Sequence, residues 1–186
     1  VIDVIKDTSP VAAPANLAAS DYLGASGQGD KGGFVLLTFD FSADNPGKAG
    51  KGNVTGYRIF REIQIDAAGA KKYISWATVS AFDPTPLGAD GDKMRVVVAT
   101  LGDPFPANYK VAAEVAGASS ALAKKISSTS KVVFANVKPD YSTLRGIKAA
   151  LVGSELSALV GPASATANSE LPPAAVSGIK AYDVPN

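Results

Sequence analysis

Residues that commonly carry catalysis are scarce in this chain. It contains no histidine and no cysteine, which removes thiol nucleophiles, disulfides, iron–sulfur clusters, the usual zinc and copper sites and every histidine-based triad. The remaining nucleophile pattern is Ser-x-x-Lys at Ser128–Lys131, in which a desolvated lysine can activate the serine. That motif normally opens a helix, whereas here it precedes a strand-like run. We therefore expect no catalytic residues and no enzymatic activity.

Oxygen ligands for a hard cation occur together at one place. Asp90 and Asp92 flank Gly91, with Asp83 nearby, and a flexible loop with several carboxylates can hold calcium. The number of ligands is too small for a dedicated site, so a solvated acidic turn is the better interpretation. We expect neither a metal nor a cofactor.

Aromatic residues offer a possible binding surface. Trp76 and Tyr73 could form a platform on which a sugar ring stacks, extended by Tyr22, Tyr57 and Tyr109. Core packing is the simpler explanation, because a lone tryptophan in a two-layer sandwich usually fills the space between the sheets. Exposure of the Trp76 ring distinguishes the two interpretations. The binding residues stay unknown at this level.

Composition limits the class of protein and its partners. The 186 residues are 46% hydrophobic, enough for one sizeable domain or two small ones, and the formal charge is +1. A nearly neutral chain is not expected to bind nucleic acid. No apolar run approaches the ~18 residues of a membrane helix, so we expect no membrane span. Missing cysteine weakly favours a secreted or cell-surface protein.

Hydrophobic alternation and turn residues predict short strands along most of the chain. Period-two spacing places Tyr57 and Ile59, with Arg61, on one face of their strand. Residues 119–126 are the one segment that suggests a short helix. We therefore predict an all-β sandwich whose strands fall at residues 33–41, 54–63, 73–79, 93–101, 109–115, 131–137, 144–152 and 158–167.

An internal similarity suggests tandem modules. Residues 10–21 align without gaps on residues 172–183, with five identical positions. The match is short and rich in common residues, so chance is the alternative, but proline-rich punctuation before a strand is typical of module boundaries. We predict one module at 10–171 and the start of a following repeat at 172–186.

The segment before this module, residues 1–9, contains the strand-like run Val1–Asp7. It is either the end of a preceding module or a donor strand that pairs with the open sheet edge of another chain. In both cases the expected partners are neighbouring repeats or other copies of this chain.

Three motifs carry a family resemblance. Residues 13–19 form a proline-led short strand, Leu37–Phe39 is similar to a Leu-x-Trp core motif, and Val54–Arg61 matches Val-Thr-Gly-Tyr-x-Ile-x-Arg. Together they resemble a bacterial fibronectin type III repeat, which implies an immunoglobulin-like sandwich of about 100 residues.

Two segments compete for the sixth strand of that family. Tyr109–Ala113 keeps a Tyr-x-Val pattern, whereas Ile147–Ala149 follows a suitably spaced proline and leads into a closing hairpin. The second is preferred, which makes residues of about 81–136 a large β-rich insertion.

The resemblance implies a non-catalytic structural module of an extracellular or cell-surface protein, acting as a spacer, adhesive or filament-forming repeat. The alternative is a carbohydrate-binding or spacer module attached to a secreted polysaccharide-active enzyme, with a glycan as the partner.

Overall fold

The computed structural model describes residues 9–24, 32–46, 48–81, 93–102, 106–115, 133–141 and 155–168. The strands in these ranges form two sheets, and the described residues hold almost no helix. The prediction of an all-β sandwich is confirmed. The short helix expected at 119–126 lies outside the described residues, as do Val1–Asp7 and 172–186.

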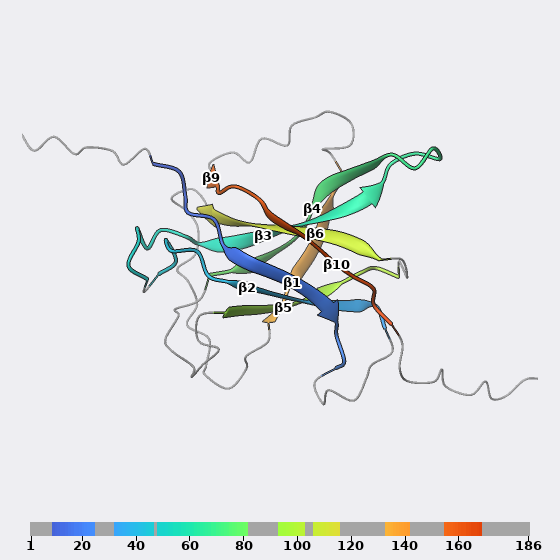
Figure 1. Ribbon diagram of the computed structural model, residues 1–186, viewed down its shortest axis with the longest axis horizontal. Helices are drawn as coiled ribbons and strands as arrows, with labels where there is room; N and C mark the ends of the chain where they lie inside the picture. Colours follow the sequence, from blue (N-terminus) through green and yellow to red (C-terminus); the bar gives the residue numbers. More distant parts are fainter. Residues whose placement is uncertain are drawn as a thin grey trace, which may run out of the picture.

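The first sheet has the order β1-β2-β5-β7 and the second has the order β10-β6-β3-β4-β8, with β9 paired to β6 (Figure 1). All described pairings are antiparallel except the two-residue pairing of β5 with β7. The strands are β1 Ala15–Asp21, β2 Phe34–Asp40, β3 Gly56–Gln64, β4 Lys71–Ser80, β5 Lys93–Ala99, β6 Ala107–Val115, β7 Val133–Phe134, β8 Asn136–Asp140, β9 Glu155–Leu156 and β10 Val160–Ala165.

Period-two alternation decides which side chains fill the space between the sheets. In β2 the buried residues are Val35, Leu37 and Phe39. In β3 the buried side chains are those of Tyr57, Ile59 and Arg61, as the spacing predicts, and Gly56 is also buried. Successive side chains of a strand point to opposite faces, so β2 and β3 each supply one row to the core. The unusual member is Arg61, a cation among apolar side chains.

Two strands come from the segment predicted as an insertion. Both β5 and β6 lie within residues 81–136, yet β5 lies between β2 and β7, and β6 lies between β10 and β3. Tyr109–Ala113 is part of β6, beside β3, whereas Ile147–Ala149 lies outside the described residues. Each of these strands is therefore an interior member of its sheet.

The first and last strands of the sandwich run side by side in the same direction, as Figure 1 shows for β1 and β10. At one end the Val11 amide donates to Glu155 Oε1 at 3.3 Å, and at the other the Asn168 amide donates to Asp21 Oδ1 at 3.1 Å. The described chain thus enters the sandwich at one end and leaves it at the opposite end. We call this pair of strands the β1–β10 seam.

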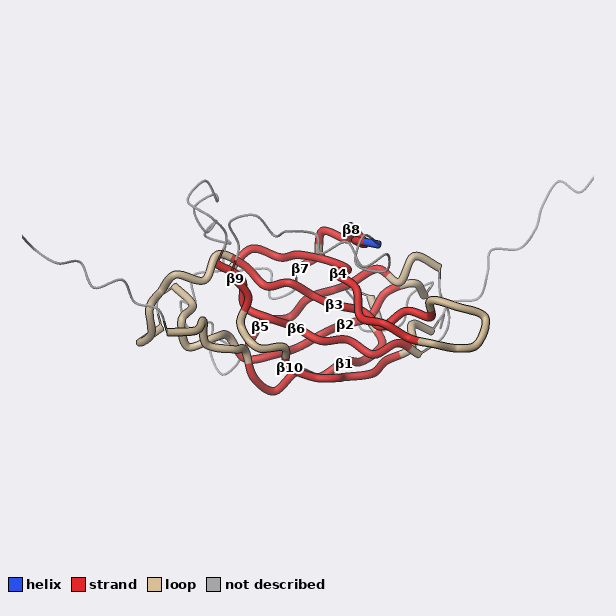
Figure 2. The backbone as a smooth tube through the Cα atoms, turned by 90° about the horizontal axis from the view of Figure 1, so that it is seen from above, coloured by secondary structure: helices blue, strands red, loops and turns tan. Residues whose placement is uncertain are grey.

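Seen from above in Figure 2, the strands run lengthwise and the described loops gather at the two ends. One end holds the β2–β3 connection and the start of β3 at Tyr57. The other holds the β3–β4 turn, residues Thr100–Gly102 after β5, and Arg61. We call them the Tyr57 end and the Arg61 end.

Candidate functional site

A network of buried polar groups closes the Tyr57 end. The Tyr57 hydroxyl donates to Asn45 Oδ1 at 2.8 Å and accepts from the Ser42 amide at 3.0 Å. Ser42, Asn45 and Tyr57 are completely buried. Burial raises the pKa of Tyr57 far above its ordinary value, although the bond from the Ser42 amide opposes this shift. The phenol therefore stays neutral and structural.

Asp44 ties this network to the lead segment before β1. Its carboxylate accepts from the Ala12 amide at 2.8 Å and from the Lys51 amide at 2.9 Å, while Ser42 Oγ donates to the Ala12 carbonyl at 2.6 Å. Asp44 is 5% exposed. A buried carboxylate needs such donors, so these bonds hold the β2–β3 connection against the lead segment. We call the bonded group of Ala12, Ser42, Asp44 and Lys51 the latch.

Arg61 is the central residue of the opposite end. Its side chain is 1% exposed, and its guanidinium carbon lies 4.6 Å from the centroid of the Trp76 ring. Nη1 donates to the Thr100 carbonyl at 2.8 Å. Trp76 is held in turn, because its Nε1 donates to the Ala99 carbonyl at 2.9 Å. Guanidinium groups suit such stacking because they are planar and weakly hydrated.

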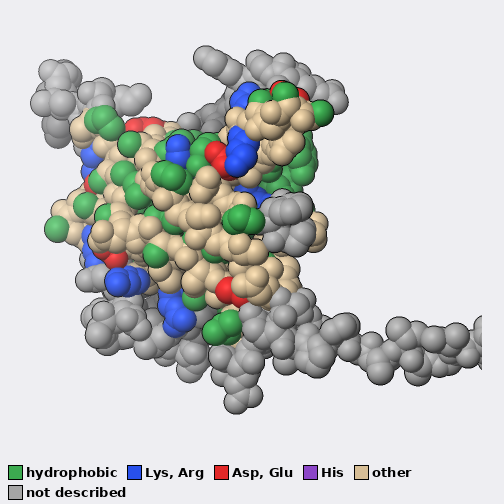
Figure 3. Space-filling view, turned by 45° about the vertical axis from the view of Figure 1, so that its right-hand side comes forward, with side chains coloured by type: hydrophobic (Ala, Val, Ile, Leu, Met, Phe, Trp, Pro, Cys, Tyr) green, Lys and Arg blue, Asp and Glu red, His purple; other side chains and the backbone are tan. Residues whose placement is uncertain are grey.

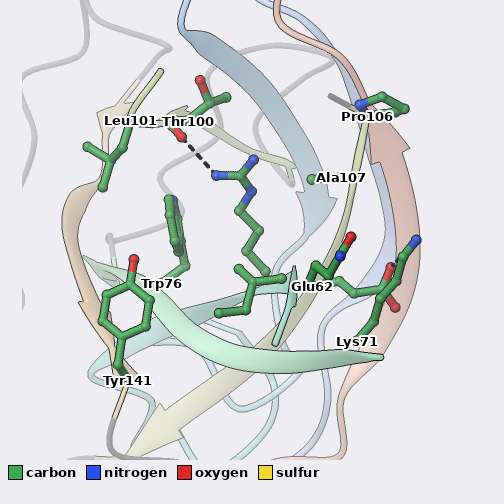
Figure 4. Close-up of a pocket in the computed structure, with 11 residues that line it drawn as sticks. Glu62, Lys71, Trp76, Thr100, Leu101, Pro106, Ala107 and Tyr141 are labelled. Atoms are coloured by element: carbon green, nitrogen blue, oxygen red, sulfur yellow. Dashed lines mark hydrogen bonds and ion pairs between the residues drawn. The ribbon is translucent and has the colours of Figure 1, made fainter. Parts of the chain in front are cut away.

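A pocket of about 490 Å³ opens beside this stack (Figure 4). It is contributed by β3, β4, β6, the ends of the β5–β6 connection and the residue after β8. Its lining residues are Arg61, Glu62, Ile63, Gln64, Lys71, Trp76, Thr100, Leu101, Pro106, Ala107 and Tyr141. A space of this size falls within the roughly 300–1,000 Å³ of small-molecule sites.

The two sides of the pocket differ in chemistry. Leu101, Trp76 and Tyr141 lie on one side, and Glu62 and Lys71 lie on the other (Figure 4). Glu62 Oε2 accepts from Asn108 Nδ2 at 2.8 Å and lies 3.7 Å from Lys71 Nζ. Burial and the negative charge of Glu62 raise the pKa of Tyr73, which sits opposite Glu62 in the β3–β4 pairing.

The rim of the pocket includes a strained turn. Leu101 has a φ of 57° and Gly102 a φ of 83°. Positive φ is rare for a bulky residue and is maintained only where the surroundings enforce it. The side chain of Leu101 is 61% exposed and that of Tyr141 is 52% exposed. This turn therefore presents an apolar group at the mouth rather than hiding it in the core.

The aromatic residues proposed from the sequence do not form one platform. Trp76 is 3% exposed, and Tyr57 and Tyr109 are completely buried. The core interpretation of Trp76 agrees with this burial. Tyr22 belongs to a separate cluster, in which its ring meets those of Phe34 and Phe134 edge-on at centroid distances of 6.4 and 6.0 Å.

The other chemical candidates lie outside the described residues. They are Asp83, Asp90, Asp92, Ser128 and Lys131. Within the described ranges, no three histidine, cysteine, aspartate or glutamate side chains come together as a metal site would need. On the face in Figure 3, acidic and basic side chains are interspersed.

Sequence reasoning missed Tyr141 and Leu101. Tyr141 follows a lysine, a proline and an aspartate, between the strands predicted at 131–137 and 144–152. Leu101 resembles the last residue of an apolar strand. The signal that was present is Gly102, which permits a tight turn directly after it.

Comparisons with protein-family models, curated proteins and solved structures return no match to this chain. In the part of the chain that is described, no helix has the length and apolar character needed to cross a membrane.

Proposed function

We propose that this chain is a non-catalytic structural module of an extracellular or cell-surface protein, a spacer or adhesive repeat of fibronectin type III kind. The observation that carries the proposal is the β1–β10 seam. Because the chain enters at one end of the sandwich and leaves at the other, successive modules of this kind extend end to end instead of folding back.

The strand order supports the family assignment. If β1 to β6 and β10 are lettered A, B, C, C′, E, F and G, one sheet holds A, B and E, and the other holds C′, C, F and G. An immunoglobulin-like sandwich divides its strands in this way, with A, B and E opposite C, F and G. On this lettering the additional strands β7, β8 and β9 lie between F and G in sequence.

The seam also suits a module that transmits tension. Force applied through the entry of β1 and the exit of β10 acts along these strands, so the hydrogen bonds of β1 to β2 and of β10 to β6 are loaded together. If both points of attachment were at the same end, the force would break these bonds one after another. Bonds that are loaded together resist a larger force, which suits a spacer under tension.

The proposed partners are other protein chains, including copies of this one, and pairing through Val1–Asp7 remains the proposed route. At the surface of the first sheet, Phe34 is 37% exposed and Phe134 is 61% exposed, and their rings meet edge-on at 6.4 Å. This cluster offers a neighbouring copy apolar contact area.

Single-molecule pulling tests the load-bearing role, because a chain without cysteine accepts attachment points at chosen sites. One variant carries Ser9→Cys and Asn168→Cys, at opposite ends of the seam. The matched control carries Leu23→Cys and Asn168→Cys, both near the end where Asn168 bonds to Asp21. We expect a clearly higher unfolding force for the first pair. Equal forces would contradict the proposal.

Light scattering and negative-stain electron microscopy then separate a spacer from a filament-forming repeat. Filaments that disappear when Val1–Ser9 is deleted support assembly through this segment. A monodisperse monomer in both proteins rules out the filament form and leaves the spacer role to the pulling experiment.

A further inference from the structure

We propose that the pocket at the Arg61 end binds a neutral saccharide unit, with one face of the sugar ring against Tyr141 and its hydroxyl groups directed at Glu62, Gln64 and Lys71. This goes beyond the structural role, which needs no pocket. It also differs from the aromatic platform that the sequence offered as the alternative to core packing, because the exposed ring is that of Tyr141 and not that of Trp76.

The apolar side of the pocket supplies a flat contact surface. Tyr141 is 52% exposed, whereas Trp76, which also lines the pocket, is 3% exposed and is held by Ala99 and by the stacked Arg61. In Figure 4, Tyr141, Trp76 and Leu101 share this side. An exposed tyrosine ring has few rotatable bonds, so it binds the C–H face of a sugar at little cost in conformational entropy.

The polar side supplies both hydrogen-bond donors and hydrogen-bond acceptors. Glu62 accepts from Asn108 and is close to Lys71, and Gln64 Nε2 donates to the Asp66 carbonyl at 2.7 Å. A carboxylate, an amide and an ammonium group therefore line one wall. Hydroxyl groups act as donors and acceptors at once, so a polyol can satisfy all three.

The charge and polarity of the lining disfavour other ligand classes. A purely apolar ligand would remove Glu62 and Lys71 from water without giving them partners. The lining holds two cations, Arg61 and Lys71, and both already have partners: Arg61 bonds to the Thr100 carbonyl and stacks on Trp76, and Lys71 lies beside Glu62. A phosphate or carboxylate ligand would have to compete with these interactions and would meet the Glu62 carboxylate. A neutral ligand with one apolar face and several hydroxyls avoids both penalties, and a pyranose ring has that form.

The strained turn at Leu101 is also consistent with a pocket that binds a saccharide. Its positive φ holds an exposed leucine at the mouth, opposite the polar wall. In a merely structural turn, an asparagine or glycine would adopt this φ at lower cost. An apolar side chain at the mouth favours ligands that can place C–H groups against it.

The test is a titration of the intact chain with glucose, galactose, mannose, N-acetylglucosamine, cellobiose and chitobiose. Saturation-transfer difference NMR reports contact with each sugar, and emission from Trp76, the single tryptophan, reports occupation of this pocket. We expect saturable binding of at least one probe by both readouts. If none of the six saturates, the proposal is overturned.

Variants distinguish this pocket from adventitious binding elsewhere. Tyr141→Ala should weaken binding by about tenfold, because a stacked ring contributes about 1.4 kcal/mol. Tyr141→Phe keeps the ring and should stay within about twofold. Phe134→Ala removes an exposed ring outside the pocket and should leave the affinity unchanged.

Tyr141 is half-exposed, so its variants are expected to fold, and circular dichroism checks this directly. If Tyr141→Ala and Phe134→Ala have equal effects on a binding sugar, the sugar does not occupy this pocket and the assignment is wrong.

Discussion

The Tyr57 end and the Arg61 end of the sandwich each accommodate a buried polar side chain of β3, but they do so differently. Both Tyr57 and Arg61 project from the inner face of β3, and both bring a polar group into the core. Around Tyr57, the β2–β3 connection folds over the hydroxyl and closes the end with Ser42 and Asn45. Around Arg61, the guanidinium stacks on Trp76 beside a pocket.

The difference shows that burial of a polar side chain does not by itself indicate a binding site. At the Tyr57 end, both hydrogen bonds of the hydroxyl join it to the β2–β3 connection of the same chain, and the groups involved are completely buried. At the Arg61 end, the supporting residues are equally fixed, but half-exposed groups such as Tyr141 and Leu101 surround an open space. Rigid support combined with accessible groups is what a binding site requires.

Removal of the latch carboxylate should have the largest effect. Asp44→Ala leaves the amides of Ala12 and Lys51 without their acceptor, so we expect a loss of about 3 kcal/mol in the free energy of unfolding. Urea unfolding measures it. The control, Asp66→Ala, removes an exposed carboxylate that accepts from Ala70 and should cost under about 1 kcal/mol. Equal losses of free energy in the two variants would mean that the Asp44 bonds stabilise the fold no more than those of an exposed carboxylate.

Trp76→Phe tests whether the Arg61 end is as rigid as the Tyr57 end. The change removes the bond to Ala99 and weakens the stacking of Arg61, so we expect a loss of about 2 kcal/mol. Circular dichroism during urea unfolding replaces the lost tryptophan signal. Phe134→Leu, on an exposed ring, is the control at under about 0.5 kcal/mol.

Tyr57→Phe should cost about 1 kcal/mol at neutral pH, because the hydroxyl bonds to Ser42 and Asn45 are lost. The effect of this variant on the free energy of unfolding should also depend on pH in the alkaline range. The folded protein holds the Tyr57 proton above the pKa of about 10 in the unfolded chain, so this stabilisation is complete below pH 10 and is lost as the pH rises further.

The free-energy difference between the native chain and Tyr57→Phe should therefore shrink above pH 10, by up to about 1.4 kcal/mol per pH unit. Urea unfolding at pH 8 to 11 measures it, with Tyr141→Phe as the exposed control. A difference that stays constant across this range would contradict a buried, neutral phenol.

The smallest effect on stability is expected for Tyr141→Ala. Because the ring is half-exposed and lies at the pocket mouth, its removal should change the free energy of unfolding by no more than about 0.5 kcal/mol. Thermal unfolding checks this. A large loss would mean that Tyr141 is part of the core, and the contrast between the two ends would weaken.

Much of the sandwich could be predicted from local alternation. The rows Val35–Leu37–Phe39 and Tyr57–Ile59–Arg61 follow from period two, and the burial of Trp76 follows from its size. Which strands are neighbours could not be predicted, because β5 and β6 carry ordinary strand patterns that do not encode their partners. Local patterns therefore predict residues 81–136 as an insertion and do not indicate that β5 and β6, which come from this segment, have neighbours on both sides.

The pocket could not be predicted from the sequence for a related reason. Arg61 and Trp76 are 15 positions apart, and Tyr141 is 65 positions beyond Trp76, so only sheet pairing brings them together. The pairing of β4 with β8 brings Tyr141 near Trp76, through the register of Ser75 with Asp140. No local pattern specifies that register.

The β1–β10 seam has a consequence for how the protein is made. Its two marker contacts join residues 144 and 147 positions apart in the chain. At a synthesis rate of roughly 5–20 residues per second, about 7 to 30 seconds separate the appearance of Val11 from that of Glu155. Throughout that interval β1 lacks its neighbour across the seam, so the nascent chain depends on β2 and the latch to keep its first strand from pairing with other chains.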